Sequence, residues 1–281
     1  MFEPKNLPTV VCESTIIPGV KFGFSHNKER ISPASPNIDP IHIHGYAEIF
    51  FDIRSDVSFL VDNKLYPLSH GDIIISPPGV THVCIFESDT VHEHACLWID
   101  ADRYSPILDF IYREDFSPHI SLGVDECERV YRLLTELELA MNDPALELTR
   151  ASAMLGILSS LSVARGVPPE QTHLPHAMQL IVDDIHTNCA QIKSVNDIIA
   201  RHFISGATLN RYFKKYIHLS PREYLESQKL ALATKLLLSG ESVTECCMKA
   251  GFSDCSHFIC LFKRKFGTTP FKYKQRSRHI W

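Results

Sequence analysis

The sequence predicts a two-domain protein of mixed class: an N-terminal β-barrel with a helical hairpin, followed by a C-terminal all-α domain. Three observations predict it. Short apolar runs separated by turn signals fill residues 1–100, as is typical of strands. From about residue 124 the apolar residues follow a spacing of three and four, as is typical of amphipathic helices. A pattern that occurs twice near the C-terminus indicates a duplicated helical module.

Charge divides the chain into the same two parts. Residues 176–281 carry 16 Lys and Arg against 8 Asp and Glu, whereas residues 1–175 carry 12 against 25. This division favours a nucleic-acid-binding module joined to a domain that stays off the nucleic acid. No apolar run is long enough to cross a membrane, and none resembles a signal peptide. We therefore expect a cytoplasmic, nucleoid-associated protein with no membrane partner.

The cysteines predict free thiols. Their number, nine, is odd, and no pair has Cys-x-x-Cys spacing. Free thiols in a reducing compartment explain this usage better than a framework of disulfides or a zinc site.

The N-terminal strands are separated by recognisable turns. Turn signals stand at 18–19, 62–63, 71–72 and 77–79, each containing Gly, Pro or Asn. Residues 28–40 are polar and rich in proline, so we expect a loop there. Residues 41–44 alternate apolar and His with period two, which predicts a strand with two distinct faces.

Two helices should follow the barrel as a hairpin. The first begins near residue 124 and is broken at 142–144, and the second ends near Gly166. Their apolar stripe either pairs two subunits in a homodimer or packs on the protein's own sheet, and the sequence leaves both open. We place the effector-binding and dimerisation domain at 1–166, a linker at 167–175 and the helical domain at 176–281.

The repeated pattern defines two modules of the helical domain. The two copies share an aromatic residue, two basic residues, a proline and a tyrosine at a constant offset of 49 residues. The first copy consists of Phe213, Lys214, Lys215, Pro221 and Tyr224, and the second of Phe262, Lys263, Arg264, Pro270 and Tyr273. A short helix, a turn and a helix that ends in cations are typical of a helix-turn-helix for DNA.

Helix caps support this reading. Ser194, Ser220 and Ser242 are each followed three residues later by an acidic residue, the pattern of a capping box. Pro221 then stands at the first position of a helix that ends at Leu238, before Ser239-Gly240. This helix should be a rigid rod between the two modules.

The outward faces of the two recognition helices are the candidate contacts with double-stranded promoter DNA. Arg pairs with guanine edges and Asn with adenine edges in the major groove, while Lys suits phosphates. Two such helices on a rod can enter successive turns of the groove, roughly 34 Å apart. The candidate residues are Ala207, Thr208, Asn210, Arg211, Lys214 and Lys215 in the first module, and Cys255, Ser256, His257, Lys263 and Arg264 in the second.

This part of the chain resembles the AraC/XylS family of bacterial transcription regulators. The resemblance lies in 250–254, 258, 262–267 and 269–273, and more loosely in 198–224. It implies a seven-helix domain that reads two adjacent major-groove segments, usually as an activator that works with RNA polymerase. The sequence departs at Ile204, where the first turn lacks a Gly, and at Cys260, where an Arg is often found. We therefore expect most base specificity from Asn210 and Arg211.

A second candidate site lies in the barrel. His42, His44 and Glu48 are separated by even numbers of residues, and Gly71, Pro77, Gly79 and His82 follow downstream. Together they resemble the two motifs of the cupin β-barrel, over about 20–100. Trp98 is a candidate for the apolar wall of the same site. We expect the run of His92, Glu93 and His94 to be solvated rather than a further site.

Three readings of this cluster compete. Three imidazoles and a carboxylate are sensible ligands for Zn²⁺, Mn²⁺, Fe²⁺ or Ni²⁺. They also suit a metal-free pocket that hydrogen-bonds a small polar effector, or they are satisfied structural groups. The AraC/XylS resemblance implies a sugar or related metabolite, usually without metal. No cofactor is then required, although a divalent metal is one of the open readings.

A metalloenzyme is the alternative to a regulator. A cupin enzyme with a fused helical domain would explain the His and Glu residues, but it leaves the duplicated module unexplained. We therefore expect a ligand-responsive regulator rather than an enzyme.

Overall fold

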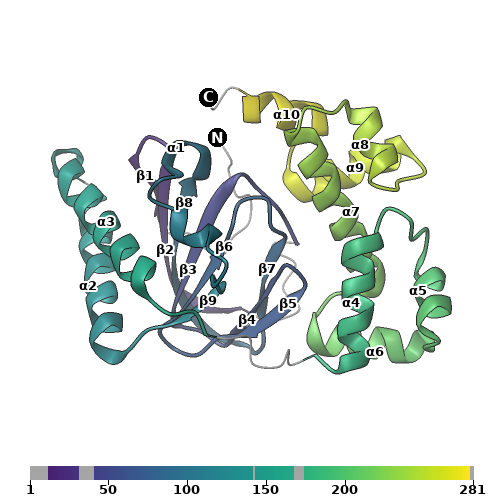
Figure 1. The fold of residues 1–281 in the computed structure, drawn as a ribbon, viewed down its shortest axis with the longest axis horizontal. Helices are drawn as coiled ribbons and strands as arrows, with labels where there is room; N and C mark the ends of the chain where they lie inside the picture. Colours follow the sequence, from purple (N-terminus) through teal and green to yellow (C-terminus); the bar gives the residue numbers. More distant parts are fainter. Residues whose placement is uncertain (1–11, 32–40, 142, 168–173, 279–281) are drawn as a thin grey trace.

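The computed structural model describes residues 12–31, 41–141, 143–167 and 174–278. Its N-terminal part is a barrel of two sheets, and its C-terminal part is entirely helical (Figure 1). The predicted two-domain mixed fold is confirmed. Among the described residues, no helix is both long and apolar enough to cross a membrane.

The barrel consists of a six-stranded sheet, in the order β1-β2-β8-β3-β6-β9, and a three-stranded sheet, in the order β5-β4-β7. All neighbouring strands are antiparallel. The strands are β1 (Cys12–Ile17), β2 (Val20–Ile31), β3 (Tyr46–Arg54), β4 (Val57–Val61), β5 (Lys64–Pro67), β6 (Asp72–Ser76), β7 (His82–Phe86), β8 (Thr90–Asp100) and β9 (His119–Ser121). Short helical turns α1 (Ala101–Tyr104) and η1 (Asp109–Tyr112) lead from β8 to β9.

Successive side chains of a strand point to opposite faces, so each sheet contributes to two cores. Phe50, Phe59 and Ile74 point into the barrel, where the two sheets face each other. Ile49 and Ile73 point outward from the larger sheet, to a second core. The strands of the larger sheet are therefore apolar on both sides, and something must cover the outer one.

A helical hairpin covers it. Helix α2 (Val124–Ala140) and helix α3 (Glu147–Val163) are joined by the turn η2 (Pro144–Leu146). Val130, Leu134 and Leu137 are buried against the sheet. The apolar stripe of α2 thus packs on the protein's own sheet, and pairing of two subunits through the hairpin stays a prediction.

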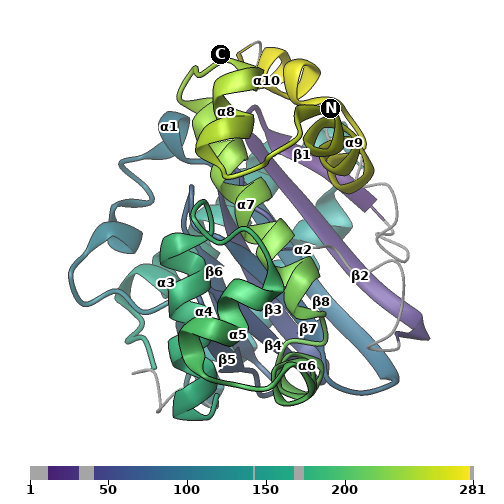
Figure 2. The same ribbon diagram turned by 90° about the vertical axis from the view of Figure 1, so that its right-hand side faces the viewer.

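The helical part contains two modules on one rod. Its helices are α4 (His176–Asn188), α5 (Val195–His202), α6 (Gly206–Tyr216), α7 (Pro221–Leu238), α8 (Val243–Lys249), α9 (Cys255–Phe266) and α10 (Pro270–Arg278). Helix α7 packs on α4 and α6 at one end and on α8 and α10 at the other. The capping boxes at Ser194, Ser220 and Ser242 are all present. Figure 2 shows α4 and α6 in front of the smaller sheet, and Figure 1 shows α5 on the far side of the helical part from the barrel.

Two local expectations were wrong. Residues 28–31, expected in a loop, continue β2, whereas 32–40 lie outside the described residues. Residues 41–44 form no strand; they contribute a single bridge between His42 and His82, with mutual backbone N–H···O distances of 3.1 Å. A strand forms only where several consecutive residues pair with a neighbouring strand, and here His42 alone pairs with β7.

Candidate functional site

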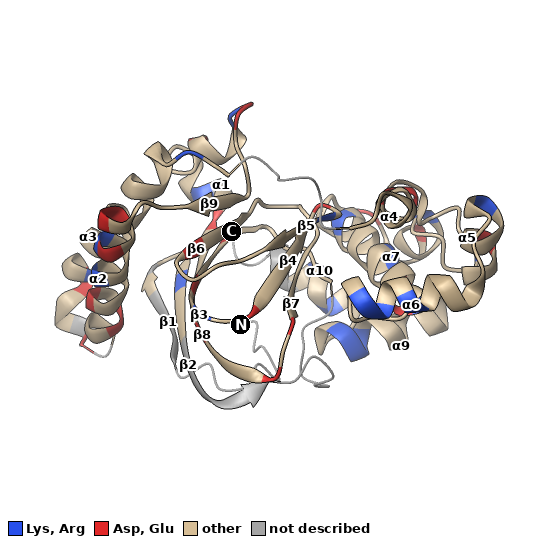
Figure 3. Cartoon of the chain, turned by 90° about the horizontal axis from the view of Figure 1, so that it is seen from below, with Lys and Arg blue, Asp and Glu red and all other residues tan. Residues whose placement is uncertain are grey.

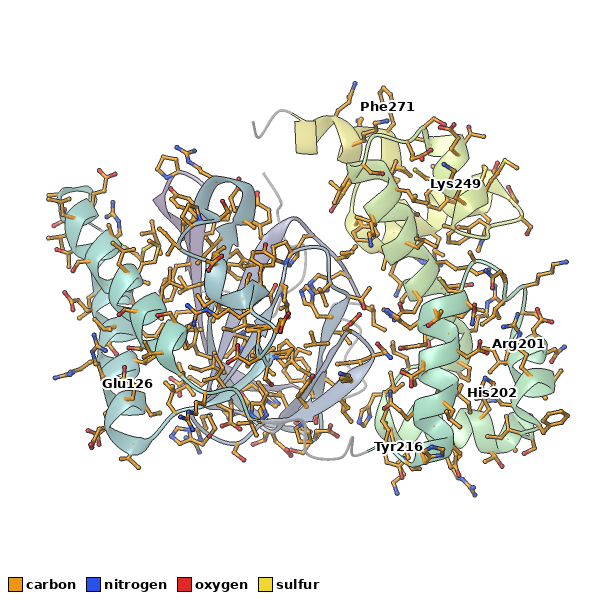
Figure 4. The ribbon with its side chains drawn as sticks, viewed as in Figure 1. Glu126, Arg201, His202, Tyr216, Lys249 and Phe271 are labelled. Carbon is orange, nitrogen blue, oxygen red and sulfur yellow. A yellow bond between two sulfur atoms is a disulfide. The ribbon has the colours of Figure 1, made fainter. Side chains whose placement is uncertain are left out.

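The first helix-turn-helix module is formed by α5 and α6. Ser205 caps α6, because its hydroxyl accepts from the Thr208 N–H at 3.1 Å. Leu209 and Phe213 are fully buried and fix the inner face of α6. Helix α5 is held to α4 by Asp184, which accepts from His202 at 2.9 Å and from Arg201 at 3.2 Å. Figure 4 shows Arg201 and His202 on the side of this module that faces away from the barrel.

The outer face of α6 carries the residues that the sequence assigned to DNA. Most of them are exposed, and Thr208 is half-buried near the cap. The Asn210 amide donates to the Gly206 carbonyl at 2.9 Å, so one of its two N–H groups already bonds within α6. The exposed residues are Ala207, Asn210, Arg211, Lys214 and Lys215.

The second module is formed by α8 and α9. Asp254 caps α9 by accepting from the Ser256 N–H at 2.7 Å. Phe258 and Phe262 fix the inner face. The outer face exposes Ser256, His257, Lys263 and Arg264, with Cys260 beside them.

Cys255 differs from our expectation. Its sulfur is bonded to that of Cys247 in α8, so it turns toward the neighbouring helix instead of outward. The prediction of free thiols was therefore wrong for this pair. Nothing in the sequence indicated the bond, because a separation of eight residues matches no familiar cysteine motif. Six other cysteines of the described residues are free.

We expect loss of the Cys247–Cys255 bond to lower the free energy of unfolding of the protein by about 2 kcal/mol. The bond closes an eight-residue loop between α8 and α9, which restricts the unfolded chain. Urea unfolding of the oxidised protein, with and without a thiol reductant, measures the difference. Cys255→Ser should abolish the effect of reductant, whereas Cys260→Ser should keep it because Cys260 is free and exposed. An equal stability of the two redox states would contradict the prediction.

The two recognition helices lie on one side of the helical part. Figure 3 shows the Lys and Arg segments of α6 and α9 on that side, and Figure 1 shows the two helices toward opposite ends of the helical part. Helix α7 joins the two modules, so their spacing is fixed by a continuous helix of 18 residues. Two basic helix ends held at a fixed spacing suit a duplex whose phosphates repeat with the helical turn.

The barrel residues His42, His44, Glu48 and His82 come together. One potential ligand atom from each lies within 4.8 Å of the others. His44 and His42 come from the segment before β3, Glu48 from β3 and His82 from the start of β7. The even spacing in the sequence therefore predicted that these side chains converge, although residues 41–44 do not form the strand that this argument assumed.

Glu48 is the centre of the cluster. Its Oε2 lies 3.0 Å from His44 Nε2 and 3.5 Å from His82 Nε2, and accepts from Trp98 Nε1 at 2.8 Å. Burial raises the pKa of Glu48, but hydrogen bonding and attraction from His44 and His82 prevail and hold it well below the usual value. The site thus contains a buried carboxylate that stays ionised, and Trp98 belongs to it directly.

The barrel interior contains further polar groups that the sequence reading missed. His92 is fully buried, and burial lowers the pKa of His94 to about 4, so the expectation of a solvated run was wrong. Opposite His94 on β3, burial raises the pKa of Asp52 to about 6, although Ser55 opposes this. The signal was available: His92, His94, Cys96 and Trp98 alternate along β8, which places them on one face.

The helical part contacts the barrel through an apolar cluster. Leu60, Leu65 and Ile85 on the outer face of the smaller sheet share a core with Met178 and Ile181 of α4. The sequence predicted the barrel and the helical domain, but not this contact between them.

Polar contacts surround this core. His186 pairs with Asp62 at 3.2 Å, and His218 pairs with Glu87 at 3.2 Å. Near Glu87 a cavity of about 260 Å³ is lined by barrel residues together with Lys215 and Tyr216 of α6. Figure 4 shows Tyr216 at the end of the helical part that faces the barrel.

The segment that carries the cluster contacts the helical part on both sides. Ile41, which precedes His42, is 2% exposed and belongs to the shared apolar core. Tyr46, beyond His44, is near Tyr273 of α10: burial first, and then this neighbour, raise the pKa of Tyr273. The ligand cluster is therefore directly connected to the interface between the two parts.

Known proteins resemble the chain in the same two parts. A family model described as a helix-turn-helix domain matches residues 199–276, from α5 to α10. YfiF of Bacillus subtilis, described as an HTH-type transcriptional regulator, is 26% identical over 247 residues, covering 82% of this chain and 77% of that protein. The HTH-type transcriptional activator RhaS of Escherichia fergusonii is 25% identical over 248 residues, covering 84% and 87%.

Among solved structures, ToxT from Vibrio cholerae aligns with 91% of this chain and 98% of its own, at 13% identity and a TM-score of 0.38. The likeness to the sequence relatives extends over the barrel as well as the helical part, since more than four-fifths of the chain is covered.

Proposed function

Because this chain belongs to the AraC family of helix-turn-helix transcriptional regulators, we propose that it activates transcription and that a small ligand in the barrel controls it. DNA binding and transcriptional regulation follow from the family. The family is not one of enzymes, so the metalloenzyme alternative is set aside. The observation that supports this function best is the pair of modules repeated at a constant offset on one rod, with basic residues on one side.

We assign most base specificity to the first module. Arg211 is exposed on α6, where a guanidinium can pair with a guanine edge through two hydrogen bonds. The second module presents Ser256, His257 and Cys260 at the corresponding face, and Lys263 and Arg264 beyond them for phosphates. Because Cys255 is bonded to Cys247, α9 presents fewer side chains that can contact bases than the sequence predicted.

The barrel cluster of His42, His44, Glu48 and His82, with Trp98, is the proposed effector site. A buried ionised carboxylate, imidazoles and an indole N–H suit a polar ligand such as a sugar or a related metabolite. The proposed partners are promoter DNA and RNA polymerase in the cytoplasm. The ligand binds one arrangement of the barrel and the helical part more tightly than another, and so shifts the protein toward the arrangement that it binds better.

We expect Arg211→Ala to weaken specific DNA binding about 5- to 150-fold, because a bidentate base contact contributes roughly 1–3 kcal/mol. Genome-wide occupancy of the tagged protein, by chromatin immunoprecipitation, identifies the sites. The affinity for a promoter fragment recovered in this way is then measured for both proteins by fluorescence anisotropy.

Arg132→Ala is the matched control, because Arg132 is exposed on the hairpin, away from α6. It should keep every promoter site that Arg211→Ala loses. Absence of discrete sites for the wild-type protein would overturn the proposed function, and an unchanged affinity of Arg211→Ala would overturn the assignment of this residue.

A further inference from the structure

The orientation of two imidazole rings in the barrel cluster defines which nitrogen faces its centre. His44 Nδ1 lies 3.1 Å from the Tyr46 carbonyl, and His82 Nδ1 lies 2.9 Å from the Val80 carbonyl. A carbonyl only accepts, so Nδ1 carries the proton in both rings. In a neutral ring Nε2 is then a bare lone pair, and both lone pairs point to the centre of the cluster.

The group nearest to these two nitrogen atoms, the Glu48 carboxylate, is also an acceptor. Glu48 Oε2 lies 3.0 Å from His44 Nε2 and 3.5 Å from His82 Nε2. His82 is 1% exposed, and its Nε2 has no hydrogen-bond partner within the described residues. These three atoms converge on one point inside the barrel, where the carboxylate also accepts from Trp98 Nε1 at 2.8 Å.

The three imidazole rings of the cluster lie close together. The centroids of His44 and His82 are 4.8 Å apart, and those of His42 and His82 are 4.3 Å apart. A single cation at the point of convergence satisfies all the lone pairs at once.

We propose that this cluster holds a divalent transition-metal cation, ligated by His42, His44, Glu48 and His82, and that its occupancy controls DNA binding. The inference rests on the proposed function, and it names a metal cation, in place of a sugar or related metabolite, as the ligand of the same site. Neutral imidazoles whose second nitrogen donates to a backbone carbonyl, together with one carboxylate, are the donors that Zn²⁺ and its neighbours prefer. The Trp98 indole N–H fixes the carboxylate from outside the ligand shell.

The connection to DNA binding runs through residue 41. His42 is bonded to Ile41, which is buried in the apolar core shared with Met178 and Ile181 of α4. A cation that holds His42 against His82 therefore holds Ile41 in the interface with the helical part. In this arrangement the recognition helices expose their basic ends on one side, so occupancy should favour the state that binds DNA.

The test uses the full-length protein freed of metal with a chelator. Calorimetric titration with Zn²⁺ should show one site per chain, and Co²⁺ should give the visible absorption of nitrogen and oxygen ligation. Glu48→Gln and His82→Ala should both lose it, whereas His70→Ala, an exposed histidine outside the cluster, should keep it. Circular dichroism checks that each variant is folded.

The affinity for a recovered promoter fragment is then measured with and without Zn²⁺. We expect metal to tighten binding of the wild-type protein at least about fivefold, the lower end of ordinary coupling between sites, and to leave Glu48→Gln unchanged. No stoichiometric metal binding would overturn the site, and metal binding with unchanged DNA affinity would overturn its control of DNA. After either of these results, specific DNA binding by the metal-free protein would still support the proposed function. If the protein bound DNA specifically neither with nor without metal, that result would count against the proposed function.

Discussion

Replacing Phe213 by alanine will lower the free energy of unfolding by about 3 to 5 kcal/mol, as expected for a fully buried aromatic side chain. Phe213 is 0% exposed, and its ring packs edge-on against Tyr224 at 5.3 Å between centroids. The cluster to which it belongs also includes Leu60 and Ile85 of the smaller sheet. Denaturant unfolding measures the total loss. Hydrogen exchange should show reduced protection in β4 and β7 as well as in α4 and α6.

Phe203→Ala is the matched control. Phe203 ends α5 with a left-handed backbone conformation, and its side chain is 97% exposed. The same chemical change there should alter stability by less than about 0.5 kcal/mol. Loss of protection in α4 and α6 alone, with β4 and β7 unaffected, would show that the two parts do not share one core in solution.

Local rules were enough to predict most of the helical part. Each capping box satisfies N–H groups that the helix leaves unpaired, so Ser194, Ser220 and Ser242 mark helix starts whatever surrounds them. The repeat extends even to the recognition helices, whose caps Ser205 and Asp254 stand 49 residues apart.

Contacts between distant segments were beyond such rules. The run Val57–Val61 is buried at every position, which indicates a strand covered on both faces, but not that α4 covers the outer one. The disulfide was missed for the same reason, because the turn between α8 and α9 decides which sulfur atoms meet. The sequence predicted the barrel cluster because Glu48 lies on β3 and does point to the interior. Residues 41–44 form no strand, but the bridge between His42 and His82 brings His42 to the same place.

Gly251→Ala should be among the most destabilising single changes in the helical part. Its φ is +79°, where an L side chain costs about 1–2 kcal/mol, and its carbonyl accepts from the buried Lys229 ammonium at 2.8 Å. A Cβ would lie 2.7 Å from both Cα and the carbonyl carbon of Ala190, and closer still to its oxygen. These are backbone atoms between α4 and α5, so relief requires the two modules to move apart. Together with about 1–3 kcal/mol for overpacking, we expect a loss of about 2 to 5 kcal/mol in unfolding free energy.

Gly267→Ala separates the two causes of this loss. Gly267 also has a positive φ, +67°, but a Cβ there would meet nothing within 4 Å. Urea unfolding should therefore show a loss of only about 1–2 kcal/mol, from the backbone conformation alone. The excess at Gly251 measures the close approach of the second module to the first. Because this contact, together with α7, holds α6 and α9 at their spacing, Gly251→Ala should also weaken promoter binding more than Gly267→Ala. Equal effects of the two substitutions on stability would mean that the modules are not in contact at this point.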